Sequence, residues 1–202
     1  IIKMSLRCPR IGFLHHLAFN NGGVFMDIEE IKSFVAPYYQ HKDMMHDLTH
    51  IERVMKSVIK LVMLCKLDVD IFLILYAACF HGIVDQHKNE ITEWLLKKRM
   101  TRVRISQILQ LANESHKENV PKTREGKILH DAHMIEGGKT FLIVKSLITG
   151  SLRDQTLDET IKYIENNILG KGTCYLEPAI EIYKGQQSFA KKFINDLKKG
   201  LK

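Results

Sequence analysis

The sequence predicts an all-helical fold, a single helical bundle, and three observations favour it. Apolar residues recur three or four positions apart along most of the chain, which is the spacing of one face of an α-helix. No segment alternates apolar and polar residues for long enough to predict a β-sheet. The length of 202 residues and the hydrophobic content of 45% suit one compact domain with a continuous core.

Residues 1–25 differ from the rest, because they contain no Asp or Glu and end near the turn-forming run Asn20–Gly23. We expect an N-terminal extension here. It could be disordered, a targeting segment, or a consequence of where the sequence begins, since the first residue is Ile. The folded domain should comprise residues 26–202, with Asp27 as the N-cap of its first helix.

The apolar pattern then predicts nine helices in this domain. The third is apolar nearly all round, so it should be buried on most sides. A polar stretch at 85–89 and a loop at 113–121 should separate helices. The expected helical ranges are 28–39, 47–65, 69–80, 91–95, 101–112, 123–137, 141–147, 157–168 and 177–197.

Charge and cysteine content restrict the function classes. The net charge of +7 favours anionic ligands such as phosphates. A nucleic-acid partner is disfavoured, because no aromatic residues interleave the basic runs at 97–104 and 191–199. Four cysteines without a C-x-x-C spacing fit a reduced, cytoplasmic protein. The longest apolar run, Ile71–Phe80, is half of what a membrane span needs, so we expect no membrane segment.

Four short segments carry His and Asp side chains on otherwise apolar helices, which is how a helical domain can build a metal site. They are His46–His50, His81-Gly82, His116 and His130–His133. Positions four apart share a helix face, so His46 and His50 should project together. His81 and Asp85 would do so if the helix continues past Gly82.

Three blocks of this chain resemble those of the HD-domain phosphohydrolases. The blocks are His50-x-x-Arg53-Val54, the apolar run ending in His81, and 122–132, and the resemblance spans roughly residues 27–199. It is nearest to the small stand-alone bacterial and archaeal members. It implies that His50, His81 and Asp131 bind a divalent metal ion, which could be Mn, Fe, Ni, Co, Zn or Mg.

Two positions depart from the family pattern. Gly82 replaces the Asp of the His-Asp pair that names the family, and His133 stands where the later D-A-D pattern has its second Asp. Mutation of a residue that hydrogen-bonds to a metal ligand lowers metal affinity by roughly 10- to 100-fold, so the loss of a carboxylate ligand itself should lower it further. Asp85 could substitute for the missing ligand.

The resemblance implies a metal-dependent phosphohydrolase acting on small phosphate esters, with nucleotides as the expected class and weakened activity in view of Gly82. Asp85 and His116 could protonate the leaving group, and Lys88 and Lys122 could offset phosphate charge. The alternative is a degenerate HD domain that binds a nucleotide or protein partner without catalysis. Whether the chain forms a homodimer stays open.

Other motifs carry less weight. The spacing His46-x-x-x-His50 occurs in zinc proteases, but these need Glu where this chain has Asp47. The run Gly170-Lys171-Gly172 follows a helix and reads as a turn. The chain contains no G-x-S-x-G motif, so the sequence does not indicate a serine hydrolase.

Overall fold

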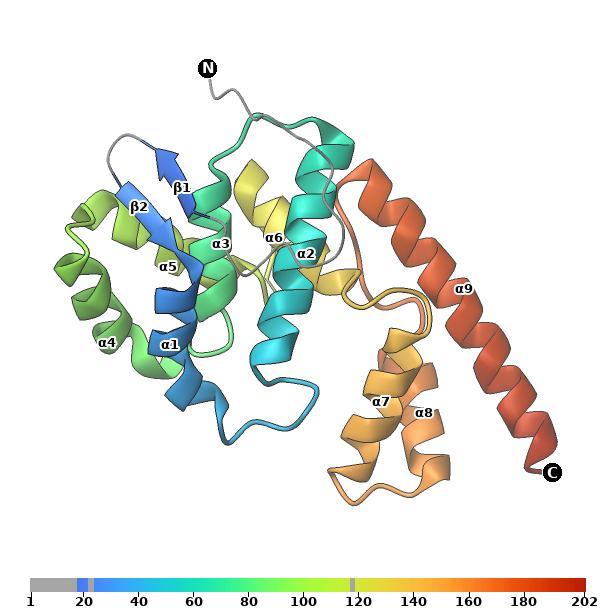
Figure 1. The fold of residues 1–202 in the computed structure, drawn as a ribbon. Coiled ribbons are helices and arrows are strands. Elements are labelled where there is room, and N and C mark those ends of the chain that lie inside the picture. The colour runs from blue at the N-terminus through green and yellow to red at the C-terminus, as the bar shows by residue number, and fades with distance from the viewer. Residues whose placement is uncertain (1–17, 22–23, 117–118) are drawn as a thin grey trace.

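The computed structural model describes residues 18–21, 24–116 and 119–202. Most of the predicted extension at residues 1–25, and part of the turn predicted at Asn20–Gly23, lie outside the described residues. The described part of the chain contains nine helices and one short hairpin, so the predicted all-helical class is confirmed (Figure 1).

The hairpin was not expected from the sequence. β1 (Ala18–Asn21) pairs antiparallel with β2 (Val24–Asp27), with Ala18 opposite Asp27 and Asn21 opposite Val24. Each strand has four residues, which is too short for a period-two pattern to stand out. Asp27 ends β2 and caps the first helix, because its carboxylate accepts from the amides of Glu29 and Glu30.

The helix bounds follow the predicted order closely. They are α1 (Ile28–Tyr39), α2 (Leu48–Cys65), α3 (Ile71–Phe80), α4 (Val84–Lys97), α5 (Arg102–Glu114), α6 (Arg124–Met134), α7 (Phe141–Ser151), α8 (Leu157–Asn167) and α9 (Glu177–Gly200).

Side-chain caps explain where several helices begin. Asp47 accepts from the amide of Thr49 at the start of α2, and Thr123 accepts from the amide of Gly126 at the start of α6. Each bond satisfies an amide that has no partner within its own helix. The caps therefore fix the first turns of the two helices from which metal-ligand candidates project.

The central helix is α3, as the sequence predicts. Its residues from Phe72 to Phe80 are all buried, and it packs against α1, α2, α5 and α6. α2 and α6 also pack against each other beside it (Figure 1). The C-terminal end of α3 and one face each of α2 and α6 therefore meet in the interior.

Helix α3 ends at Phe80, and residues 81–83 form a turn before α4. His81 and Asp85 therefore do not share the face of one continuous helix. α4 begins at Val84, earlier than the sequence suggests, and is interrupted by non-helical backbone at His87. The polar stretch at 85–89 thus belongs to an exposed helical turn and not to a loop.

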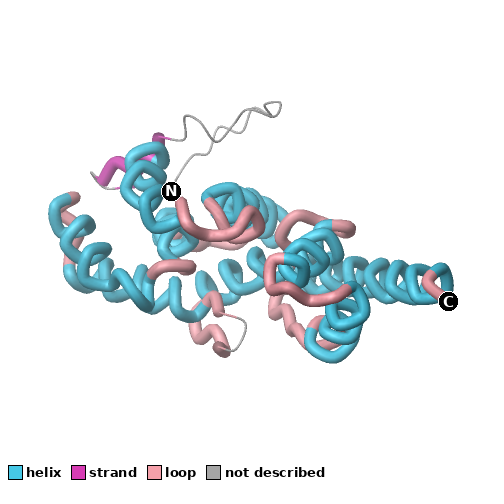
Figure 2. The backbone as a smooth tube through the Cα atoms, turned by 90° about the horizontal axis from the view of Figure 1, so that it is seen from below, coloured by secondary structure: helices cyan, strands magenta, loops and turns pink. Residues whose placement is uncertain are grey.

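Helices α7 and α8 lie beside α9 at one end of the molecule (Figure 1). Figure 2 shows the C-terminal helix, α9, extending beyond the rest of the chain at that end. These three helices have a small hydrophobic cluster of their own, built on Ile161, Ile164 and Ile194. Within the described residues, no helix has the length and apolar character needed to cross a bilayer.

Candidate metal centre

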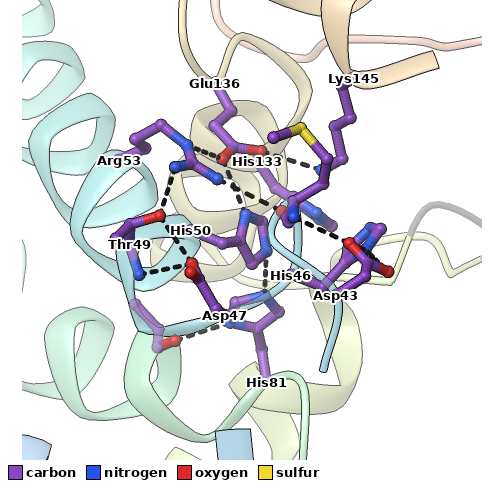
Figure 3. Close-up of polar contacts among 12 residues, drawn as sticks. Asp43, His46, Asp47, Thr49, His50, Arg53, His81, His133, Glu136 and Lys145 are labelled. Carbon is purple, nitrogen blue, oxygen red and sulfur yellow. Dashed lines mark hydrogen bonds and ion pairs between the residues drawn. The ribbon is translucent and has the colours of Figure 1, made fainter. Parts of the chain in front are cut away.

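Three imidazoles converge in the interior. His50 lies in the first turn of α2, His81 directly follows α3, and His133 lies in the last turn of α6. One nitrogen from each lies within 4.8 Å of the others, and the Nε2 atoms of His50 and His81 are 3.0 Å apart (Figure 3). The structure thus brings together two of the three predicted ligands, together with His133.

Each of these rings is held from behind through its Nδ1 atom. That of His50 is 2.8 Å from the carboxylate of Glu136, that of His81 is 2.6 Å from the Ala78 carbonyl, and that of His133 is 3.4 Å from the Ser115 carbonyl. Carbonyl and carboxylate oxygens only accept, so the proton of each neutral ring sits on Nδ1. The lone pairs on the Nε2 atoms are then free to bind a cation.

Burial also keeps the three rings neutral. It lowers the pKa of His50, lowers that of His81 well below its ordinary value, and contributes most to the pKa of about 3 for His133. Neutral imidazole is the form that binds metal ions. The donor set therefore fits a divalent ion.

Glu136 connects the centre to the helices around it. Its buried carboxylate accepts from Arg53 Nε at 2.6 Å and from Lys145 Nζ at 3.1 Å, besides its bond to His50. Burial alone would raise the pKa of Glu136, but the bonds from His50 and Arg53 and the charge of Lys145 outweigh it and hold the pKa at about 2. Glu136 was not recognised from the sequence, although its spacing of three from His133 would put both on one face of the helix predicted at 123–137.

Asp131, the third predicted ligand, is not a member of the imidazole group. Its fully buried carboxylate accepts hydrogen bonds from the backbone amides of Tyr175 (2.9 and 3.0 Å) and Leu176 (2.7 Å). Residues two apart on an α-helix point about 200° away from each other. Because His133 faces His50 and His81, Asp131 faces the segment that leads into α9.

His46 and His50 do project together, with ring centroids 5.9 Å apart. The Nδ1 atom of His46 is 2.8 Å from the carboxylate of Asp43, however, and His46 is not part of the three-imidazole group. His46 therefore flanks the centre on the side of the segment between α1 and α2 (Figure 3).

The two predicted proton donors lie beside each other. His116 Nε2 donates to the carbonyl of His81 at 3.0 Å, and its Nδ1 is 4.0 Å from the exposed carboxylate of Asp85. Both are thus adjacent to the turn that carries His81. Asp85 is not among the residues that could share an ion with the imidazoles, so it does not replace the missing carboxylate.

The two predicted phosphate-binding lysines line the same pocket. Lys88 and Lys122 border a cavity of about 720 Å³ between α4, α5 and the segment before α6. Amide side chains of Gln110, Asn113 and Asn119 complete much of its polar wall. The two lysines can offer positive charge to an anionic ligand, although the carboxylate of Glu114 lines the same cavity.

At Gly82, the space that a side chain would enter is already occupied. An added Cβ would lie 2.8 Å from the hydroxyl of Tyr39 and 3.3 Å from Lys42 Nζ. Lys42 donates to the Gly82 carbonyl, and the Tyr39 hydroxyl donates to the Cys79 carbonyl at 3.2 Å. The side chains of Tyr39, at the end of α1, and of Lys42, just after it, therefore occupy the space that a side chain at position 82 would enter.

Comparison with protein-family models and with curated protein sequences finds no match. Solved structures do match. The Lin1889 protein from Listeria innocua has a TM-score of 0.67 at 24% identity, covering 87% of this chain and 98% of that one. Bacillus subtilis YpgQ in complex with ADP has 0.68 at 17%, covering 85% and 93%. An HD-superfamily hydrolase from Bacillus thuringiensis has 0.65 at 18%, covering 86% and 97%.

Proposed function

We propose that this chain, which has the fold of the HD-superfamily hydrolases, is a metal-dependent phosphohydrolase acting on small phosphate esters, nucleotides in particular. The observation that carries the proposal is the convergence of His50 and His81, whose Nε2 atoms face each other, with a third donor nitrogen from α6 within 4.8 Å. That arrangement is typical of a catalytic ion with open positions.

A bound divalent ion lowers the pKa of water and polarises a phosphoryl oxygen, which together favour attack on phosphorus. The protein would supply the remaining functions. His116 and Asp85, 4.0 Å apart beside the His81 turn, would deliver a proton to the leaving oxygen. Lys88 and Lys122 would offset phosphate charge in the pocket that they both line.

Two further observations support a nucleotide as the substrate class. The structure of Bacillus subtilis YpgQ was solved with ADP, a nucleotide. The chain also carries a net charge of +7, which favours anionic ligands. A cytoplasmic location belongs to the same proposal, and the thiols of Cys65, Cys79 and Cys174 are free. The homodimer stays a prediction.

The test is phosphate release from a panel of nucleotides and small phosphate esters, with each divalent ion added to metal-free protein. Activity should fall by several orders of magnitude in His50→Ala and His81→Ala. His41→Ala is the matched control, because His41 is exposed and lies outside the centre. Equal activity in all three variants would show that the reaction does not depend on an ion bound by His50 and His81.

The second candidate is a binding domain without turnover, favoured by Gly82 and by the contacts that Tyr39 and Lys42 make around it. It predicts that nucleotides bind with measurable affinity while no substrate in the panel releases phosphate with any ion. Calorimetric titration of ADP into the protein, run beside the phosphate assay, separates the two candidates.

A further inference from the structure

The donor atoms at this centre include no carboxylate. Two of the positions that carry Asp in the resembled pattern hold Gly82 and His133, while Asp131 faces away, so the inward-facing donors are imidazole nitrogens only. We propose that the centre is a three-imidazole site, with His133 as its third ligand, that takes zinc-class ions in preference to Mg²⁺ and Mn²⁺. This deepens the proposed function and rests on its metal site, but not on hydrolysis.

The spacing of His50 and His81 is the first argument. With both Nδ1 protons committed to Glu136 and to the Ala78 carbonyl, no proton remains to bridge the two Nε2 atoms, 3.0 Å apart. Two facing lone pairs at that distance repel each other. A cation between them removes the repulsion, and binding of the outer nitrogen to a carboxylate or carbonyl is the usual support of a metal-bound histidine.

The second argument is that both nearby carboxylates already accept hydrogen bonds from other groups. Glu136 uses one oxygen for His50 and Arg53 and the other for Lys145, so it orients the ligand without an oxygen free for the ion. Asp131 uses both oxygens for the amides of residues 175 and 176. His133 is the group on α6 that reaches the other two imidazoles, with its ring centroid 5.2 Å from each of theirs.

The class of ion follows from the class of ligand. Imidazole suits Zn²⁺, Cu²⁺, Fe²⁺ and Ni²⁺, whereas Mg²⁺ and Mn²⁺ prefer carboxylate, carbonyl and water oxygens. Three neutral ligands also leave the full double positive charge on the ion. An anionic group, such as a phosphate oxygen, is then the natural occupant of its open position.

The experiment measures binding and not activity. Metal-free protein is titrated calorimetrically with Zn²⁺, Co²⁺, Mn²⁺ and Mg²⁺. We expect one Zn²⁺ per chain, bound at least about 100-fold more tightly than Mg²⁺ or Mn²⁺. His133→Ala should weaken Zn²⁺ binding by more than about 100-fold, and His41→Ala should leave it unchanged. Equal affinity for Zn²⁺ and Mg²⁺, or unchanged Zn²⁺ binding in folded His133→Ala, would overturn the proposal.

A second measurement needs no variant. X-ray absorption of the zinc-loaded protein should count three imidazole ligands, and a count of two with a carboxylate would overturn the assignment of His133. The bound Co²⁺ form should show the strong visible absorption of a four-coordinate ion. Tight Zn²⁺ binding with no phosphate release would defeat the proposed function alone, and absence of Zn²⁺ binding would defeat this inference.

Discussion

At the scale of single residues, Gly82 decides whether a carboxylate can return to the centre. We expect that Gly82→Asp will not create an additional metal ligand, because its Cβ would contact the buried Tyr39 hydroxyl at 2.8 Å and its carboxylate would meet the Lys42 ammonium. Overpacking of this kind costs about 1–3 kcal/mol of unfolding free energy. Urea denaturation measures that loss, and calorimetry measures the metal affinity.

Tyr39→Phe provides the matched comparison, because it removes the hydroxyl that the new Cβ would meet. Alone it should cost about 1 kcal/mol, since the bond to the Cys79 carbonyl is lost. Combined with Gly82→Asp it should cost less than the sum of the two single changes. Strict additivity would mean that the hydroxyl does not occupy this space.

Asp131 gives a second prediction at the same scale. Asp131→Ala should lower the free energy of unfolding by about 3 kcal/mol, because the backbone amides of Tyr175 and Leu176 would lose a charged, buried acceptor. Asp68→Ala is the control, since Asp68 is exposed and should change stability by less than about 0.5 kcal/mol. Equal stability of the two variants in urea would contradict the anchoring role.

Asp131 and His133 also show how far sequence could predict the site. The resemblance named α6 together with His50 and His81, and the structure brings these two rings close to a ring from α6. The sequence does not reveal which of two residues two positions apart faces inward. That choice depends on the rotation of α6 against α2, which is set by packing of residues distant in sequence. The orienting role of Glu136 depends on the same rotation.

At the scale of elements, most helices could be predicted because their caps and apolar faces agree. The start of α4 and the β1–β2 hairpin were not predicted, and the cause is the same, because neither has a clear apolar pattern in the sequence. In the first turns of α4 the side chains of Asp85, Gln86 and Lys88 are exposed, and its buried residues, Val84, Ile91 and Leu95, are widely spaced. Strands of four residues leave even less pattern, so the hairpin could not be recognised.

The capping box of α8 gives a prediction at this scale. The Thr156 hydroxyl accepts from the Glu159 amide, while the Glu159 carboxylate accepts from the Thr156 amide at 2.8 Å. Thr156→Ala should cost about 1 kcal/mol and Thr156→Ser much less. Amide hydrogens in the first turn of α8 should exchange faster in Thr156→Ala than in Thr156→Ser. Similar exchange rates in the two variants would contradict a stabilising cap.

At the scale of the whole molecule, the candidate metal centre joins parts of the chain that are far apart. Its imidazoles come from α2, the end of α3 and α6, and Glu136 extends the connection to α7 through Lys145. The ring of Phe141, at the start of α7, also lies 4.7 Å from the Arg53 guanidinium. Helix α7, whose Leu147 packs against the separate small core, therefore contacts the main core beside the three imidazoles.

This connection predicts that the ion stabilises the entire fold. A ligand that binds only the folded state at one hundred times its dissociation constant adds about 2.7 kcal/mol, which for a chain of this size raises the melting temperature by roughly 5–10 °C. Zn²⁺ should produce such a shift in the metal-free protein, and Mg²⁺ at the same concentration should produce almost none. Calorimetric melting of the wild-type chain and of His133→Ala tests this. The variant should lose the zinc-dependent shift while His41→Ala keeps it, and an equal shift in all three would place the stabilising ion at another site.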